Sequence, residues 1–204
     1  MIKLYDTPPS GNCHKVRLML SLLGLDYQKV PVSLPDREQK TPEYLAMNPL
    51  GQVPVLDDDG VVLRDSQAIL MYLGARYGGE TWLPTGDPEA LGHVSEWMSF
   101  CSNEMLNGCA VSRALVIFNR EGDLEGAREK ARAALSVLDG FLADRDWLVG
   151  DGPTVADIAN YVYAALVHQG GIDPHGYANV SAWMGRVEAL DGYVAMDAMP
   201  APKA

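Results

Sequence analysis

Ser10, Asn12 and Cys13 share a short turn whose residue types can manage a sulfur atom. The turn, residues 9–16 (PSGNCHKV), lies between a predicted strand and the start of a predicted helix. Free N–H groups and the helix dipole favour an anion at a helix start, and a hydroxyl there can donate a hydrogen bond to a bound thiolate. Ser and Asn are also among the commonest N-cap residues. The residues alone favour helix capping and leave the thiolate role as the alternative.

Ser10 and Cys13 have the spacing of a C-x-x-C redox motif in which serine replaces the first cysteine. In a dithiol oxidoreductase the nucleophile is the cysteine nearest the helix start, where its pKa is lowered. Ser10 occupies that position here, so the protein cannot supply its own attacking thiolate from it. Cys13 is predicted to be a helix residue without a catalytic role.

Pro54 marks a second segment, NPLGQVPV at residues 48–55. A proline is tolerated where a strand begins, because it gives up no hydrogen bond of the ladder there. A cis bond before Pro54 turns the backbone of Val53 outward, where it can pair with an extended peptide. A trans bond is the commoner state of an X–Pro peptide, so both forms stay open.

Asp65 and Ser66 form a third segment, in front of an apolar helical stripe. Both residue types are good helix caps, so a helix start is the simplest interpretation. The alternative is a second site for an anion and an amine, close to the Ser10 turn.

The elements that position these segments alternate in the first half of the chain. Strands are predicted at residues 2–5, 27–32, 53–57 and 61–64. Helices are predicted after Ser10, after Pro42 and over residues 69–77, from apolar residues that recur at helical spacing. Aspartate followed by Gly60 predicts a hairpin between the last two strands. The order is βαβ, a helix, then ββα.

The second half shows helical periodicity and no convincing strand. Helices are predicted at residues 89–118 with a kink at Gly108, and at 125–143, 154–168 and 179–190. Thr154 and Asp157 have the spacing of a capping box. The Gly/Pro/Asp-rich segment between the halves reads as a linker. The sequence therefore predicts an α/β plus all-α protein, with domains at 1–78 and 89–204 joined by a linker at 79–88.

Charge divides the chain at the same place. The 204 residues include 16 basic and 27 acidic side chains, a net charge of −11. Residues 1–78 hold 8 basic and 9 acidic side chains, whereas residues 79–204 hold 8 basic and 18 acidic ones. This field disfavours nucleic acid and anionic lipid as partners. With three cysteines, no signal-peptide pattern and no apolar run near the ~20 residues of a membrane span, a cytoplasmic protein is expected.

Four segments in this order, LYDTPPSGNCHKVR, NPLGQVPVL, DSQAILMYL and TVADIANYVY, resemble a soluble glutathione S-transferase of the bacterial, serine type. The resemblance covers essentially the whole chain. It implies a thioredoxin-like domain followed by an all-helical domain, a homodimer, and glutathione as co-substrate without a metal. The implied activity is attack of a glutathione thiolate on a small electrophilic co-substrate.

The resemblance also implies roles for individual residues. Ser10 would hold the glutathione sulfur as a thiolate, with Asn12 assisting from the helix start. The remaining glutathione contacts would come from Gln39 and Lys40 at the glycyl carboxylate, Val53 beside cis-Pro54 at the cysteinyl part, and Gln52, Asp65 and Ser66 at the γ-glutamyl end. The second substrate would lie against Phe100, Glu104, Leu106 and Arg113, although core packing for the aromatic and a solvated position for the arginine are the simpler interpretations.

Two other functions stay open. Asn12, His14 and Lys15 equally match relatives that reduce disulfides or peroxides with glutathione. A non-catalytic binding or regulatory protein on the same scaffold is the third hypothesis, because a fold does not fix a function. The histidines show no ligand spacing, and no metal site is predicted.

Overall fold

The sheet of the computed structural model, which describes residues 1–196, has four strands. They are β1 (Ile2–Asp6), β2 (Tyr27–Pro31), β3 (Val55–Asp58) and β4 (Val61–Arg64), in the order β2-β1-β3-β4. β1 is parallel to β2 and antiparallel to β3, and β3 is antiparallel to β4. This confirms the predicted thioredoxin-like fold. The last part of the predicted helical domain, residues 197–204, lies outside the described residues.

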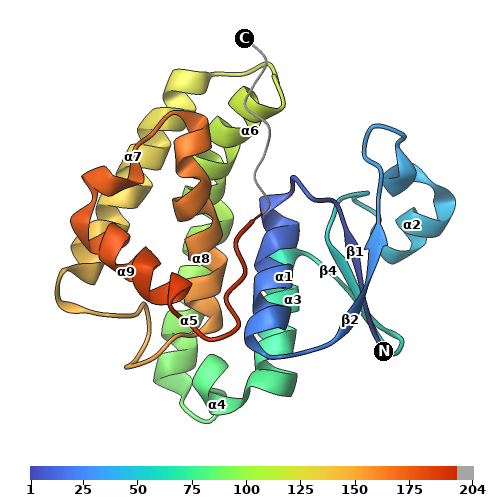
Figure 1. Cartoon of the computed structure of the whole chain (residues 1–204), viewed down its shortest axis with the longest axis horizontal. Coiled ribbons are helices and arrows are strands. Elements are labelled where there is room, and N and C mark those ends of the chain that lie inside the picture. The colour runs from blue at the N-terminus through green and yellow to red at the C-terminus, as the bar shows by residue number, and fades with distance from the viewer. Residues whose placement is uncertain (197–204) are drawn as a thin grey trace.

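The sheet is covered by helices on both faces (Figure 1). α1 (Gly11–Leu22) and α3 (Ser66–Leu73) lie side by side on one face, and α2 (Pro42–Met47) lies on the other. The short turn η1 (Glu38–Lys40) precedes α2. α1 also packs against the helical domain, so residues on most of its sides are buried.

The β3–β4 hairpin turns at Asp59 and Gly60, which both have positive φ, 48° and 94°. A two-residue turn with positive φ at both positions has a backbone twist that matches the right-handed twist of the flanking strands. β3 begins two residues later than predicted. The carbonyl of Gln52, just before it, accepts hydrogen bonds from the side chains of Tyr44 and Asn48 at 2.8 Å each, rather than joining the ladder.

The rest of the described chain is helical and contains no strand. The predicted linker holds α4 (Gly79–Trp82), which follows the π-helical turn η2 (Gly74–Gly78). The helical domain consists of α5 (Pro88–Phe100), η3 (Cys101–Ala110), α6 (Val111–Ile117), α7 (Leu124–Phe141), η4 (Leu142–Asp144), α8 (Val155–Leu166), η5 (Val167–Gly170), η6 (Pro174–Gly176) and α9 (Ala178–Glu188). None of the helices formed by residues 1–196 is long and apolar enough to cross a membrane.

α8 lies at the centre of this domain and starts with the predicted capping box of Thr154 and Asp157. The buried Asp157 carboxylate also accepts hydrogen bonds from the Leu148 N–H at 3.0 Å and from Trp183 Nε1 at 2.9 Å. One side chain therefore ties the start of α8 to the loop before it and to α9. Burial of a carboxylate is tolerated only with such partners.

Gly108 has a role that periodicity does not reveal. It lies within η3, where π-helical hydrogen bonding replaces the regular helix predicted for residues 89–118. A Cβ atom at Gly108 would lie 2.5 Å from the backbone nitrogen of Ala131 on α7. The glycine therefore allows two helix backbones to approach closely.

Replacing Gly108 by alanine is expected to lower the free energy of unfolding by about 2 kcal/mol or more, since a backbone must move to accept the methyl group. Gly140→Ala on α7 is the matched control, because a Cβ there meets nothing within 4 Å. It should raise stability by ~0.5–1 kcal/mol through helix propensity. Urea unfolding of both variants measures the difference, and equal effects would contradict the close approach.

Candidate functional site

The strand register brings the three predicted binding segments to one edge of the sheet. Val55 at the start of β3 pairs with Tyr5 near the end of β1 and with Arg64 at the end of β4. The Ser10 turn follows β1, the Pro54 segment precedes β3, and Asp65 follows β4. The antiparallel pairing therefore gathers segments that are up to 55 residues apart in sequence (Ser10 to Asp65).

Ser10 caps α1 and keeps its proton available. Its Oγ accepts a hydrogen bond from the Cys13 N–H at 3.2 Å, and its own N–H donates to the Thr7 carbonyl at 3.1 Å. A hydroxyl has one donor and two acceptor positions, so capping uses an acceptor position only. The half-buried Ser10 can cap the helix and donate to a ligand at the same time.

Asp65 caps α3 in an uncommon conformation, with φ 74°. Its Oδ1 accepts hydrogen bonds from the N–H groups of Gln67 and Ala68 at 2.9 and 3.2 Å. Non-glycine residues at positive φ often occur at functional sites. The carboxylate is exposed, whereas the next residue, Ser66, is only 2% exposed and donates its hydroxyl to Gln67 Oε1. Two helix starts therefore meet at this edge.

The peptide bond between Val53 and Pro54 is cis. Pro54 is buried, Val53 is half-buried and the Gln52 side chain is exposed. The Gln52 carbonyl bonds described above fix the loop from the side of α2. The segment is thus held in place by side chains that are not themselves among the predicted contacts.

Gln39 and Lys40 lie on the short turn η1, beside the loop that leads to Pro54. Lys40 Nζ donates to the Leu50 carbonyl at 3.0 Å. Gly51, at φ 57°, leaves room for this side chain, since a Cβ there would lie 2.6 Å from Lys40 Nζ. Gln39 Oε1 is buried and has no hydrogen-bond partner among the described residues.

Arg113 reaches the Ser10 turn, but as a buried side chain. It is 3% exposed, and it donates to the Pro9 carbonyl at 3.1 Å and to Gln169 Oε1 at 2.5 Å. Burial lowers the pKa of its guanidinium. The interpretation of a solvated arginine is wrong, because the guanidinium is committed to the peptide directly before Ser10.

The contacts of Phe100 and Glu104 lie within the helical domain. Phe100 packs edge-to-face on Trp97, which packs in the same way on Phe141 of α7. Glu104 lines a groove between η3 and α7. Figure 1 places α7 on the side of the helical domain away from the sheet. Leu106 is 38% exposed.

Tyr163 is a site residue that the sequence reasoning missed. Its hydroxyl donates to Asn12 Oδ1 at 3.2 Å, and its ring lies where a Cβ at Gly11 would clash at 2.8 Å. Lys15 Nζ lies 4.6 Å from the ring centroid and 3.1 Å from the Sγ of Cys101. Tyr163 is off the predicted apolar stripe of α8, but α8 is buried on nearly all sides. No sequence signal therefore distinguishes Tyr163 from the other residues of α8.

Cys13 is completely buried. Burial raises the pKa of its thiol to about 12, and the hydrogen bond with Ser10 acts in the opposite direction. The thiolate fraction of Cys13 is therefore negligible near neutral pH. Across residues 1–196 no three His, Cys, Asp or Glu side chains lie close enough to hold a metal ion.

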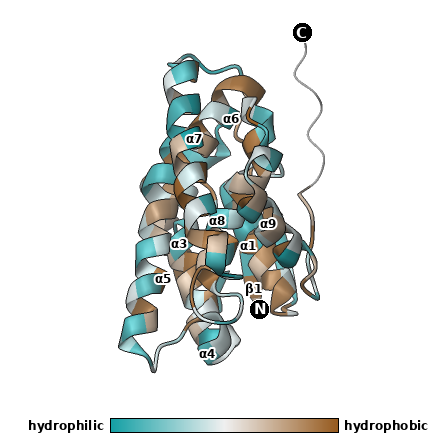
Figure 2. Ribbon diagram, turned by 90° about the vertical axis from the view of Figure 1, so that its left-hand side faces the viewer, coloured by the Kyte–Doolittle hydropathy of each residue, from teal (hydrophilic) through white to brown (hydrophobic). Residues whose placement is uncertain are grey.

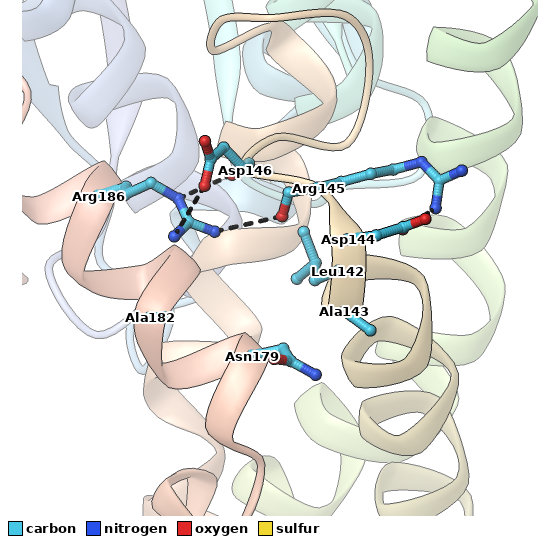
Figure 3. Close-up of a pocket in the computed structure, with 8 residues that line it drawn as sticks. All are labelled: Leu142, Ala143, Asp144, Arg145, Asp146, Asn179, Ala182 and Arg186. Atoms are coloured by element: carbon cyan, nitrogen blue, oxygen red, sulfur yellow. Dashed lines mark hydrogen bonds and ion pairs between the residues drawn. The ribbon is translucent and has the colours of Figure 1, made fainter.

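A hollow of about 250 Å³ lies elsewhere, between η4 and α9 (Figure 3). Arg186 donates from Nε to the Asp146 carbonyl at 2.9 Å, and its Nη1 lies 3.3 Å from Asp146 Oδ1. These contacts tie the loop after η4 to α9. The hollow contains none of the predicted site residues.

Comparisons with known proteins show the family of the chain. Residues 4–81 match the model of the glutathione S-transferase N-terminal domain, and residues 96–191 match that of the C-terminal domain. Glutathione S-transferase D7 of Anopheles gambiae is 28% identical over 89% of this chain and 83% of its own. A glutathione S-transferase structure from Pseudomonas fluorescens has a TM-score of 0.90 and 33% identity over 97% of this chain and 99% of its own. A glutathione transferase homolog from Lodderomyces elongisporus, solved with two glutathione molecules per subunit, has a TM-score of 0.83 and 26% identity over 94% of both chains.

The chain belongs to the glutathione S-transferase family. It is a glutathione transferase, an enzyme, so the hypothesis of a non-catalytic binding protein is not retained.

Cys13 is expected to resist alkylation by iodoacetamide at neutral pH in the folded protein, because so little of it is thiolate. Peptide mapping by mass spectrometry measures the modification at Cys13 in native and urea-unfolded protein. Labelling should appear only after unfolding. Rapid labelling of the native protein would contradict the inert role.

Proposed function

We propose that the enzyme binds glutathione with its sulfur at Ser10 and holds it as a thiolate, which attacks an electrophilic carbon or sulfur of a second substrate. One observation carries the proposal: the Ser10 hydroxyl caps α1 as an acceptor and so keeps its proton to donate. The start of a 12-residue helix adds a positive electrostatic potential. Both effects favour the thiolate over the thiol, whose ordinary pKa is about 8.5.

The proposed glutathione contacts follow the edge of the sheet. Val53 pairs through its backbone with the cysteinyl part, as an added strand does. Asp65 has a free carboxylate oxygen for the γ-glutamyl amine, and Ser66 and Gln52 bind the same end. Gln39, with an unsatisfied buried oxygen, and Lys40 bind the glycyl end. The near-neutral charge of residues 1–78 is compatible with an anionic tripeptide there.

We also propose that the enzyme is of the serine type and groups with bacterial members. The hydroxyl at the start of α1 supports the first part. The similarity to the Pseudomonas fluorescens structure, with 33% identity and a TM-score of 0.90, supports the second.

The second substrate is proposed to bind between the Ser10 turn and the helical domain. Leu106 is exposed enough to contact it, and Arg113 shapes the site through the Pro9 carbonyl. Phe100, which packs on Trp97, and Glu104, which lines the groove against α7, are proposed to contribute less than the sequence suggested.

Ser10→Ala is expected to raise the pKa of the bound glutathione thiol and to lower kcat/KM by about 10- to 100-fold, the value of a hydrogen bond to a charged group. Ultraviolet absorbance of the thiolate during a pH titration measures the first effect. Ser21→Ala is the matched control, because Ser21 lies at the other end of α1 and donates to the Gly192 carbonyl. An unchanged pKa of the bound glutathione thiol in Ser10→Ala would contradict the proposal.

Reduction of disulfides or peroxides is the second candidate activity. It is favoured by the contact between Asn12 and Tyr163, which makes Asn12 an ordered part of the site. The same variants decide between the two activities with bis-hydroxyethyl disulfide as substrate. If Asn12→Ala abolishes turnover while Ser10→Ala spares it, the reductase assignment replaces the transferase one.

The enzyme is further proposed to form a homodimer. A groove between η3 and α7, of about 330 Å³, contains Val137, which is 57% exposed, together with Lys130 and Glu104. Hydrophobic residues are interspersed with hydrophilic ones along α5 and α7 (Figure 2). Val61 and Val62 on the edge strand β4 are also exposed, at 45% and 43%. An exposed apolar groove marks an interaction surface, and we propose the η3–α7 groove as part of the dimer interface.

Val137→Lys is expected to convert the dimer to a monomer at micromolar concentration, since an isologous interface meets each substitution twice. Ser136→Lys adds the same charge one position away on α7 and should leave the dimer intact. Sedimentation equilibrium of the two variants measures the association. A monomeric wild-type protein, or a dimeric Val137→Lys, would contradict this surface.

A further inference from the structure

We infer that Tyr163 of the helical domain is a positioning residue for the thiolate: its hydroxyl holds the side-chain amide of Asn12 so that the N–H₂ end faces the glutathione sulfur. The inference rests on the proposed function and extends it across the domain boundary. The orientation of the Asn12 amide, the second hydrogen-bond donor at the sulfur, is then determined by Tyr163 of α8 and not by the domain that binds the tripeptide.

The contact is built into the packing of two helices. Tyr163 lies in the second half of α8, and its hydroxyl reaches the first turn of α1 at 3.2 Å from Asn12 Oδ1. Gly11 is the residue that allows this approach, since a Cβ there would lie 2.8 Å from the ring. The ring is 6% exposed, so it has little room to move. The hydroxyl is therefore held at the start of α1.

The direction of the hydrogen bond decides which end of Asn12 faces the ligand. The Tyr163 hydroxyl is the donor to Asn12 Oδ1, and because burial raises its pKa it keeps this proton throughout the neutral range. An amide carries an acceptor oxygen at one end and two N–H donors at the other. A donor on Oδ1 therefore leaves Nδ2 as the end for a further partner. Asn12 is half-buried and two residues from Ser10, so that partner lies at the same helix start.

Lys15 reinforces this arrangement. Its ammonium group lies over the face of the Tyr163 ring, 4.6 Å from the centroid, one turn below Asn12 on α1. A cation over a ring is attracted to the π-electrons, an effect that increases when both groups are buried. Lys15 is 1% exposed. The ring is thus held between Gly11 and Lys15, and its hydroxyl has one direction to point.

The contact is expected to change the ionisation of the bound glutathione thiol and not the affinity for glutathione. With the amide oriented, Ser10 and Asn12 present two N–H or O–H donors to the sulfur, which stabilises an anion. Without the Tyr163 hydroxyl, the amide of Asn12 is free to rotate and to present its oxygen, which repels a thiolate. The groups proposed to bind the ends of glutathione, such as Asp65 and Lys40, are unaffected.

Tyr163→Phe removes the hydroxyl and keeps the ring contacts with Gly11 and Lys15. We expect the pKa of the bound glutathione thiol to rise by about one unit. At a pH well below that pKa, the thiolate fraction is then about tenfold smaller, and kcat should fall by the same factor. At a pH above the raised pKa, kcat should recover. The affinity for S-methylglutathione, which has no thiol to ionise, should stay within about twofold. Thiolate absorbance, pH–rate profiles and calorimetry measure the three quantities.

Tyr161→Phe is the matched control. Tyr161 is a buried tyrosine of the same helix, and its hydroxyl bonds to Glu188 Oε1 at 3.0 Å and to the Tyr193 hydroxyl at 2.7 Å instead of the site. Its loss should not move the thiol pKa. An equal shift in both variants means that a general change in packing is the cause, and it overturns the inference.

Asn12 variants complete the test. Asn12→Ala and the Asn12→Ala/Tyr163→Phe double variant should show the same thiol pKa, because Tyr163 acts only through Asn12. Additive shifts would overturn the inference. If Tyr163→Phe does not fold, Asn12→Ala decides, since it removes the N–H donor without adding a charge and should raise the thiol pKa. An unchanged pKa in Asn12→Ala overturns the inference.

These outcomes are separate from failure of the proposed function. If wild-type enzyme does not lower the thiol pKa of bound glutathione, the proposed function fails. If it does, and Ser10→Ala raises that pKa while Tyr163→Phe leaves it unchanged, only the role of Tyr163 is wrong.

Discussion

The burial of α1 between the sheet and α8 is the constraint on which the rest of this structure depends. α1 carries Ser10 at its start, and side chains of both domains hold the turn directly before it. On one side, Arg17 pairs with the buried Asp6 and donates to the Pro8 carbonyl at 3.1 Å. On the other side, Arg113 donates to the Pro9 carbonyl. The turn therefore has little freedom in either direction, and a donor that must meet developing charge is most effective when it is already in place.

This constraint also explains why charged residues are buried in α1. Lys15 and Arg17 occupy positions that a surface helix would leave to solvent, and here both are buried. Each has a partner of its own: the Tyr163 ring and Cys101 Sγ for Lys15, and Asp6 for Arg17. Buried charges are tolerated when they are paired in this way.

Much of the architecture was predictable, because it follows from local periodicity. The βαβ-α-ββα order, the helices of the second half and the Thr154 capping box all depend on residues within a few positions of one another. The hairpin at Asp59 and Gly60 is of the same kind. Predictions that needed distant neighbours were less accurate. The 89–118 helix contains a π-helical stretch, and Gly108 is required by the close approach of Ala131 on α7, 23 residues further along the chain.

The sequence by itself determined the class of fold and the residues at the edge of the sheet, because caps, strand starts and hairpins are local chemistry. Only the tertiary structure decided what surrounds Ser10. Arg113 looked like a surface arginine and is a buried support of the turn, and Tyr163 gave no local signal yet contacts Asn12 from a helix 151 positions away. The physical reason is that each of these side chains acts through a hydrogen bond to a group in the other domain: the Pro9 carbonyl for Arg113 and the Asn12 amide for Tyr163. Helix packing brings these groups together, and the periodicity of the sequence does not encode that packing.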